Sequence, residues 1–481
     1  MLRRALALLV LIGLLSTACT SRSEISASTD NNRTGPQGSL LPPTDSESES
    51  DFGPDEQEAP ADEHLDDGRL VVQSADFQLS TMLPNGAEVT RLTEPGTLNT
   101  QPSWAPDGSR VAWVAVDEAT GETSIAADRF DGSDFREIGV DKASFYLYWD
   151  PSASRIAHLS SSTGGIDLGI AELLGEDGPT NRRVDRGQPY FLAWGPNGDE
   201  LLVHASGFRL DRIDLGNATI IVDDFPANFG APTWLPDDSL MYADIQDDQQ
   251  FLVTTGDAGE GRRPLIAYDG TLRFSVSNQG NRIVMQAGPA GDQDAVVTAS
   301  AGLTPAEDDA VLIAKQTQTT PAPELQFDDS LDAIDPIESG IPYLMGTFGG
   351  EPFPLSNNPA VAFFPSPDGQ AVAWLEESII LPNAMTLQFD ANGQRTILPP
   401  FILSQQLRQN YLPFFDQYSQ SHDFWSPSSN LFVFAGRPAG SSEPDGIWVF
   451  DRMTGEQRRI SDGVVASFTR TPQASGARSA L

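Results

Sequence analysis

The sequence is poor in cysteine, lysine and positive charge. Its single cysteine is Cys19, so no disulfide can form within one molecule. Lys142 and Lys315 are the only lysines, and 29 basic residues stand against 68 acidic ones, which gives a formal net charge of −39. A surface of that sign repels nucleic acid and anionic lipid headgroups. We therefore expect no nucleic-acid partner.

Residue patterns of the common catalytic sites are also missing. The sequence contains no Gly-x-Ser-x-Gly, the turn that carries the nucleophile of many serine hydrolases, and no His-Glu-x-x-His zinc motif. His158 and His204 should point to opposite faces of their strands, because side chains alternate along a strand. We expect no catalytic residue, no metal site and no cofactor.

The N-terminus has the features of an export signal. Arg3 and Arg4 precede an apolar run, residues 5–15, that is too short to span a bilayer. The following Leu-Ser-Thr-Ala-Cys19 resembles a bacterial lipoprotein cleavage site, although Ser16 stands where that site usually has leucine. We expect residues 1–18 to be a lipoprotein signal peptide and Cys19 to be lipidated and held at a membrane. Ordinary cleavage near Ala18 and an uncleaved anchor are the alternatives.

Residues 19–68 have the composition of a disordered acidic tether. Ser, Thr, Asn, Pro and Gly come first, and an acidic stretch with almost no large apolar residue follows. Such a stretch cannot bury enough apolar surface to offset the entropy of ordering. A spacer between membrane and folded domain is the interpretation we favour over a calcium-binding or partner-binding tail.

The rest of the chain repeats one corner, which reads Pro102-Ser-Trp104-Ala-Pro-Asp-Gly108 in its clearest copy. Proline, aspartate and glycine favour a tight turn, and the flanking apolar residues alternate as in half-buried strands. Recurrence of such a corner every 40–45 residues is typical of a β-propeller blade. The later copies are centred on Trp149, Trp194, Trp234, Val276, residues 365–369 and Trp425. We interpret the tryptophans as packing between blades.

These corners resemble the TolB-like propeller repeat over residues 69–475. The resemblance implies an all-β fold, a single β-propeller of four-stranded blades. It implies little about function, since the same blades occur in binding proteins, peptidase gates and lyases. We expect eight blades, with seven or nine as alternatives, and a ring closed by a C-terminal strand in which Phe468 replaces the tryptophan.

Two insertions interrupt the repeat, near residues 316–340 and 399–424. In the second, Ile402, Leu403, Leu407 and Tyr411 have helical spacing, which predicts a short helix. Because this segment leads into an innermost strand, it could cap the central channel; packing over a blade edge is the alternative.

Aromatic and amide side chains precede several innermost strands, where they would lie on the top face of the ring. Such residues suit a recognition surface, and packing between blade tops is the alternative. The predicted top-face binding residues are Gln101, Tyr146, Tyr148, Tyr190, Phe229, Asn358, Tyr418 and His422.

Together these features predict an exported lipoprotein, anchored in the cell membrane and facing the periplasm or the cell exterior. We expect it to be a non-catalytic scaffold or sensor whose partner is an envelope protein or peptide. The alternative is an enzyme acting on a glycan or peptide in the propeller channel. A channel-lining cluster of histidine, arginine and carboxylate would favour that alternative.

Overall fold

The computed structural model describes residues 67–175, 178–188, 190–206, 209–216, 219–223, 230–246, 249–256, 261–288 and 336–470. The chain divides into two compact units, residues 1–62 and 63–481, and every described residue belongs to the second. The predicted signal peptide, Cys19 and nearly all of the predicted tether lie outside the described residues.

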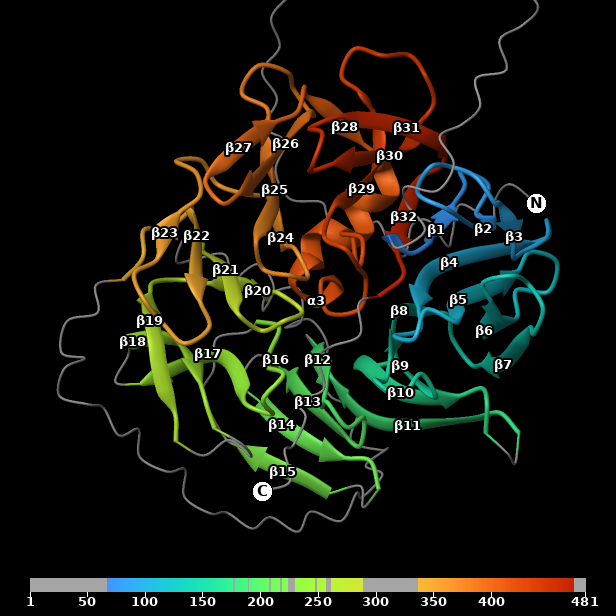
Figure 1. The fold of residues 1–481 in the computed structure, drawn as a ribbon. Coiled ribbons are helices and arrows are strands. Elements are labelled where there is room, and N and C mark those ends of the chain that lie inside the picture. Colours follow the sequence, from blue (N-terminus) through green and yellow to red (C-terminus); the bar gives the residue numbers. More distant parts are fainter. Residues whose placement is uncertain are drawn as a thin grey trace, which may run out of the picture. The chain divides into compact units, whose positions relative to one another are not determined.

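Antiparallel four-stranded sheets follow one another along the chain, and each innermost strand is one copy of the repeated corner (Figure 1). Blade 1 contains β1 (Leu70–Gln73), β2 (Leu79–Met82) and β3 (Thr90–Arg91), with β32 (Val465–Phe468) innermost. Blade 2 is β4 (Thr97–Trp104), β5 (Arg110–Asp117), β6 (Thr123–Arg129) and β7 (Arg136–Val140). Blade 3 is β8 (Ser144–Trp149), β9 (Arg155–Ser162), β10 (Gly165–Glu172) and β11 (Thr180–Gly187). Blade 4 is β12 (Tyr190–Trp194), β13 (Glu200–Ala205), β14 (Arg209–Asp214) and β15 (Thr219–Asp223).

The second half of the ring is built in the same way. Blade 5 is β16 (Thr233–Trp234), β17 (Leu240–Gln246), β18 (Gln249–Thr254) and β19 (Arg263–Tyr268). Blade 6 is β20 (Leu272–Val276), β21 (Arg282–Ala287), β22 (Pro342–Gly346) and β23 (Phe353–Pro354). Blade 7 is β24 (Ala362–Pro365), β25 (Ala371–Glu377), β26 (Met385–Ala391) and β27 (Gln394–Ile397). Blade 8 is β29 (Leu431–Pro438), β30 (Gly446–Asp451) and β31 (Gln457–Asp462), with Trp425 bridged to Phe432 on its inner side.

Blades 7 and 8 belong to one eight-stranded sheet, because β28 (Phe401–Leu403) pairs with both β26 and β29. The described strands thus form eight blades. The repeat copies at Val276 and at residues 365–369 lie on the inner strands of blades 6 and 7, so the gap between them corresponds to one blade, the sixth, with a long insertion between β21 and β22. Most of that insertion lies outside the described residues.

The C-terminal strand closes the ring as expected. β32 pairs with β1 in antiparallel register, from Leu70 opposite Phe468 to Gln73 opposite Val465. Phe468 is fully buried and occupies the position of the tryptophan in the other blades. The first blade therefore takes strands from both ends of the chain.

The corner tryptophans pack between blades, as the repeat predicts, and all are buried. Their indole nitrogens also link neighbouring blades. Trp149 Nε1 donates to the carbonyl of Ser103 at 3.1 Å, and Trp194 Nε1 donates to that of Tyr148 at 2.9 Å. In both cases the acceptor directly precedes the tryptophan of the previous blade.

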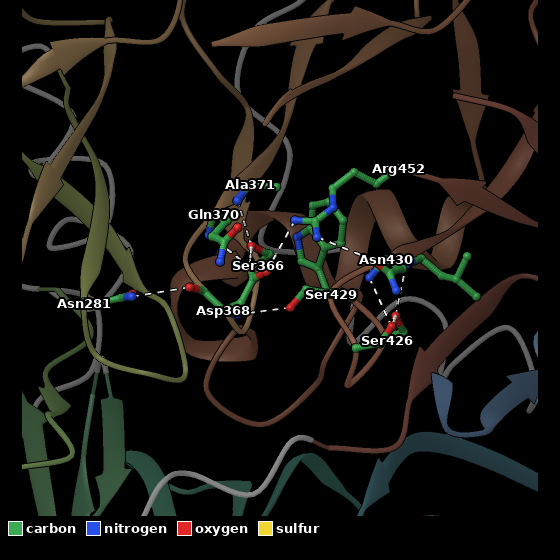
Figure 2. A network of polar contacts seen from close by, with 12 residues as sticks. Asn281, Ser366, Asp368, Gln370, Ala371, Ser426, Ser429, Asn430 and Arg452 are labelled. Carbon is green, nitrogen blue, oxygen red and sulfur yellow. Dashed lines mark hydrogen bonds and ion pairs between the residues drawn. The ribbon is translucent and has the colours of Figure 1, made fainter. Parts of the chain in front are cut away.

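The tight turns of the corners interlock on the opposite side of the blades from the insertion at residues 399–424. In Figure 2 the turn of blade 7 is bonded to those on either side. Asp368 N donates to Ser429 Oγ of blade 8 at 3.1 Å, and Asn281 Nδ2 of blade 6 donates to Asp368 O at 3.3 Å. Arg452 lies 3.5 Å from the Asp368 carboxylate. The aspartate of the repeat therefore shapes its own turn and also holds the adjacent blades together.

Candidate functional site

The insertion before blade 8 forms a compact segment, residues 404–422, which we call the plug. Its elements are a π-helical turn, η4 (Leu407–Tyr411), a 3-10 turn, η5 (Leu412–Phe414), and a single α-helical turn, α3 (Phe415–Tyr418). The predicted helix is therefore wrong at its start, because Ile402 and Leu403 lie in β28. Pairing of β28 with β29 overrides their helical spacing, and Pro413, which has no N–H, prevents a continuous helix.

Apolar side chains hold the plug to the inner strands. The Phe415 ring lies 4.6 Å from that of Phe363, edge to face, and Phe415, Leu407, Tyr411 and Leu412 are all buried. Burial of an apolar side chain such as Leu407, Leu412 or Phe415 stabilises the folded state by roughly 1.5–3 kcal/mol. The plug is thus part of the hydrophobic core.

Polar side chains of the plug bond to the inner strands of several blades. The Gln417 amide accepts a hydrogen bond from Leu192 N and donates to Leu192 O and to Tyr146 Oη, each at 2.8 Å. Tyr418 Oη donates to Gln101 Oε1 at 2.8 Å.

Other plug contacts reach the opposite side of the ring. Gln420 Nε2 donates to Pro232 O at 2.9 Å, and the Ser275 and Ser419 hydroxyls are hydrogen bonded at 3.1 Å. Figure 1 shows α3 in the middle of the inner strands. The partners of the plug named above, together with Phe363, lie at the inner edges of blades 2 to 7, so the plug covers the axis of the ring. The insertion therefore caps the central channel and does not pack over a single blade edge.

The predicted top-face residues lie mainly inside this assembly. Gln101, Tyr146, Tyr148, Tyr190, Tyr418 and His422 are buried. Asn358 is exposed and donates a hydrogen bond to Glu376 Oε2 at 3.1 Å, while Phe229 lies outside the described residues. The six buried side chains correspond to the packing alternative. We therefore do not propose them as contacts to a partner.

Two small cavities lie beside the plug. One of about 30 Å³ is lined by Trp234, Ser275, Asp416 and Arg470, among others. The other, about 20 Å³, is lined by Ser275, His422, Asp423 and Phe424, among others. A water molecule needs about 10–15 Å³ and a drug-sized ligand about 300–1,000 Å³. These spaces can hold a few waters and are too small for a sugar ring or a peptide.

Burial changes the ionisation of the groups around these cavities. Burial, together with the charge of Arg470, lowers the pKa of His422 to about 3. Burial raises the pKa of Asp416, and Arg273 partly offsets this effect. His422 is therefore neutral at pH 7 and donates or accepts hydrogen bonds without a charge.

The other described histidines are held separately. His158 Nδ1 is hydrogen bonded to Ser144 Oγ at 2.9 Å, and His204 Nδ1 to Gly230 O at 2.9 Å. Burial lowers the pKa of both, that of His204 to about 4.

Within the part of the chain that the structure describes, no group of three or more His, Cys, Asp or Glu could hold a metal ion. No described helix is long and apolar enough to cross a bilayer.

Gln417, Asp416 and Arg470 were not predicted from the sequence. Gln417 is one of several glutamines in the second insertion, and nothing in its spacing distinguishes it from Gln405 or Gln406. Arg470 follows the closing strand, where a channel position could have been inferred from the ring geometry. Asp416 carries no signal in a chain with 68 acidic residues.

Comparisons with known proteins identify the fold. No family model and no curated protein matches the chain. Among solved structures, TolB from Acinetobacter baumannii is 14% identical, with 69% of this chain and 78% of that chain covered and a TM-score of 0.37. The β-propeller domain of the trilobed protease from Pyrococcus furiosus is 12% identical, with 76% and 98% covered and a TM-score of 0.43. The dihydro-heme d1 dehydrogenase NirN is 10% identical, with 84% and 75% covered and a TM-score of 0.50.

At such low identities these similarities show the fold alone. The expected all-β propeller is confirmed, and TolB is among the structures that resemble it. The matching structures also include an oligogalacturonate lyase and an acylaminoacyl peptidase. A fold does not by itself imply a function.

Proposed function

We propose that this chain is an exported, lipid-anchored propeller that acts as a non-catalytic scaffold or sensor for an envelope protein or peptide. The targeting segment, the lipoprotein-like sequence around Cys19 and the acidic stretch after it support the anchoring. The net charge of −39 disfavours a nucleic-acid partner. The protein would face the periplasm or the cell exterior.

The plug is the observation that carries this proposal. The wide axis of an eight-bladed ring is where a propeller can hold a small ligand. Here the chain fills the top of that axis with Phe415, Gln417 and Tyr418, and the cavities beside them hold only a few waters. Opening the plug would expose several buried apolar side chains and leave the main-chain groups of Leu192 unpaired. A partner therefore binds the outer faces of the ring.

The test is purification of the full-length lipoprotein from envelope extracts in mild detergent. We expect a stoichiometric partner that also binds when both proteins are purified. Gln417 lies on the axis of the ring, away from its outer faces. In any sample that remains folded, Gln417→Glu should therefore leave the affinity for the purified partner unchanged. Mass spectrometry of the N-terminal peptide tests the acylation of Cys19. Absence of a partner, together with turnover of a glycan or peptide, would refute the scaffold.

A second candidate is an enzyme with its site in the channel. It is favoured by one observation, the grouping of Asp416, His422, Asp423 and Arg470 around the two adjoining cavities. The small cavity volumes and the low pKa of His422 argue against it. Metal analysis and assays on glycans and peptides, repeated with Arg470→Gln, decide the matter. Turnover lost in a folded Arg470→Gln variant would establish the enzyme.

A further inference from the structure

One hairpin of blade 7 has an apolar tip. Between β25 and β26, Ile379 is 94% exposed, Ile380 is 77% exposed and Leu381 is 40% exposed. We call these three residues the prong. They form the tip of the hairpin and extend from the end of the ring that the plug covers, since successive hairpins of a blade lie at opposite ends.

The hairpin that carries the prong has no charged side chain of its own. No Asp, Glu, Lys or Arg occurs between Glu377, which is exposed at the base of the hairpin, and Asp390. The carboxylate of Glu376 is buried and accepts hydrogen bonds from Trp374 Nε1 at 2.8 Å and from Asn358 Nδ2 at 3.1 Å. The tip of the hairpin therefore combines apolar side chains with an absence of charge.

Part of the main chain of the hairpin is internally bonded. Ser378 N donates to Ala384 O at 2.9 Å, and Ala384 N donates to Leu381 O at 3.2 Å. Ser378 Oγ accepts from Ile380 N at 3.3 Å and from Leu381 N at 3.2 Å. Each such bond lowers the cost of moving a peptide group from water into the less polar interfacial region of a bilayer.

We propose that the prong inserts into the interfacial region of a zwitterionic bilayer. A stable protein interface takes about 20–30 residues from each partner, far more than this tip offers, whereas a bilayer accepts a small apolar tip with bonded peptide groups. Glu377 at the base of this hairpin and Glu443 in the corresponding hairpin of blade 8 are both exposed, so anionic headgroups are disfavoured. The inference rests on the proposed lipid anchor, which holds the prong near a membrane.

The length of chain before the ring allows this contact. Asp67 accepts a hydrogen bond from Ser428 in a corner turn, so the described chain begins at the end of the ring opposite to the prong. Roughly 50 residues lie between Cys19 and that point, and an extended chain of that length spans up to about 160 Å. An anchor at Cys19 and the prong can therefore reach the same bilayer.

The test uses the full-length lipoprotein in phosphatidylcholine vesicles. Cys19 is the only cysteine, and acylation blocks its thiol, so Ile380→Cys provides one site for an environment-sensitive fluorophore. Met453→Cys is the matched control, because Met453 is 74% exposed in a hairpin at the opposite end of the ring. We expect a blue-shifted emission and quenching by nitroxide-labelled lipid at position 380, and neither at 453. Adding Ile379→Asp should abolish both effects at position 380.

Other outcomes refute the inference. Equal emission at both positions, without quenching by lipid, means that the prong stays in water. A blue shift at 380 that grows with protein density and is insensitive to the lipid quencher means self-association. Labelling of two cysteines shows that Cys19 is not acylated and contradicts the anchor. In that case, the Ile380→Cys and Met453→Cys proteins share the label at Cys19, so the difference in lipid quenching between them still decides for or against the prong itself.

Discussion

The indole nitrogen of Trp104 donates a hydrogen bond of 3.2 Å to the main-chain carbonyl of Ser467, although 363 positions separate the two residues. Trp149 and Trp194 make the same contact to the blade before their own, and Trp425 makes it to Phe364 O at 2.9 Å. The bond from Trp104 differs only in that its acceptor lies on the C-terminal strand. The contact that joins neighbouring blades therefore also joins the two ends of the chain.

The indole contact predicts different costs for two matched substitutions. Trp149→Phe removes the indole hydrogen bond to the buried Ser103 carbonyl, whereas Trp234 Nε1 has no hydrogen-bond partner among the described residues. Both substitutions remove similar apolar area. We expect Trp149→Phe to lower the free energy of unfolding by about 0.5–1.5 kcal/mol more than Trp234→Phe, because only the first substitution removes a hydrogen bond. Denaturant titration of both variants measures the difference, and equal costs would mean that packing alone matters.

Ring closure predicts that removal of residues 464–481 destabilises the whole propeller. The deletion takes away β32, which is paired with β1, and the Ser467 carbonyl that Trp104 uses. A chain that ends at Arg470 keeps both and is the control. We expect the longer truncation to fail to fold or to unfold at a much lower temperature, as seen by circular dichroism and calorimetry. If the two truncations melt alike, β32 does not hold the ring closed.

The contacts of the plug predict that loss of the Gln417 side chain lowers the free energy of unfolding strongly. Gln417→Ala removes three hydrogen bonds and leaves Leu192 N and O unpaired in the core. We expect a loss of about 2–4 kcal/mol, since each unsatisfied buried group costs about 1–3 kcal/mol. Gln405→Ala is the control, because that side chain is exposed and is hydrogen bonded to Gln409, another exposed residue of the plug. Denaturant unfolding should show little change for the control, and an equally small change for Gln417→Ala would indicate a loosely held plug.

Much of the fold could be predicted from the sequence because the repeat is local. Proline, aspartate and glycine shape each turn, and tryptophan marks each inner strand, so the blade order and the closing strand follow from their spacing. The plug could not be predicted in the same way. Its α-helical turn, α3, is held by Phe363 and Leu192, which lie far from it in sequence. The same distant contacts turned predicted surface residues such as Tyr146 into packing residues.

The buried histidine of the plug predicts a dependence of stability on pH. Burial beside Arg470 holds the pKa of His422 at about 3 in the folded protein, against an ordinary value of 6.5. Above pH 6.5 the residue is neutral in both states and makes no contribution that depends on pH. As the pH falls below 6.5, the unfolded chain binds a proton that the folded chain excludes, so folding weakens by about 1.4 kcal/mol per pH unit. The loss continues until the pH approaches 3.

His422→Gln isolates this contribution, because glutamine does not titrate. The raised pKa of Asp416 acts in the opposite direction, since its protonation at low pH favours the folded state, and that effect is present in both proteins. We expect the variant to be less stable at pH 8, where the packing of His422 against Tyr411 and Tyr418 is disturbed. Between pH 6.5 and 4 its free energy of unfolding should fall less steeply than that of the unaltered chain. Urea titrations across that range measure both curves. Parallel curves would mean that His422 is protonated as readily in the folded protein as in the unfolded one, and would contradict the prediction.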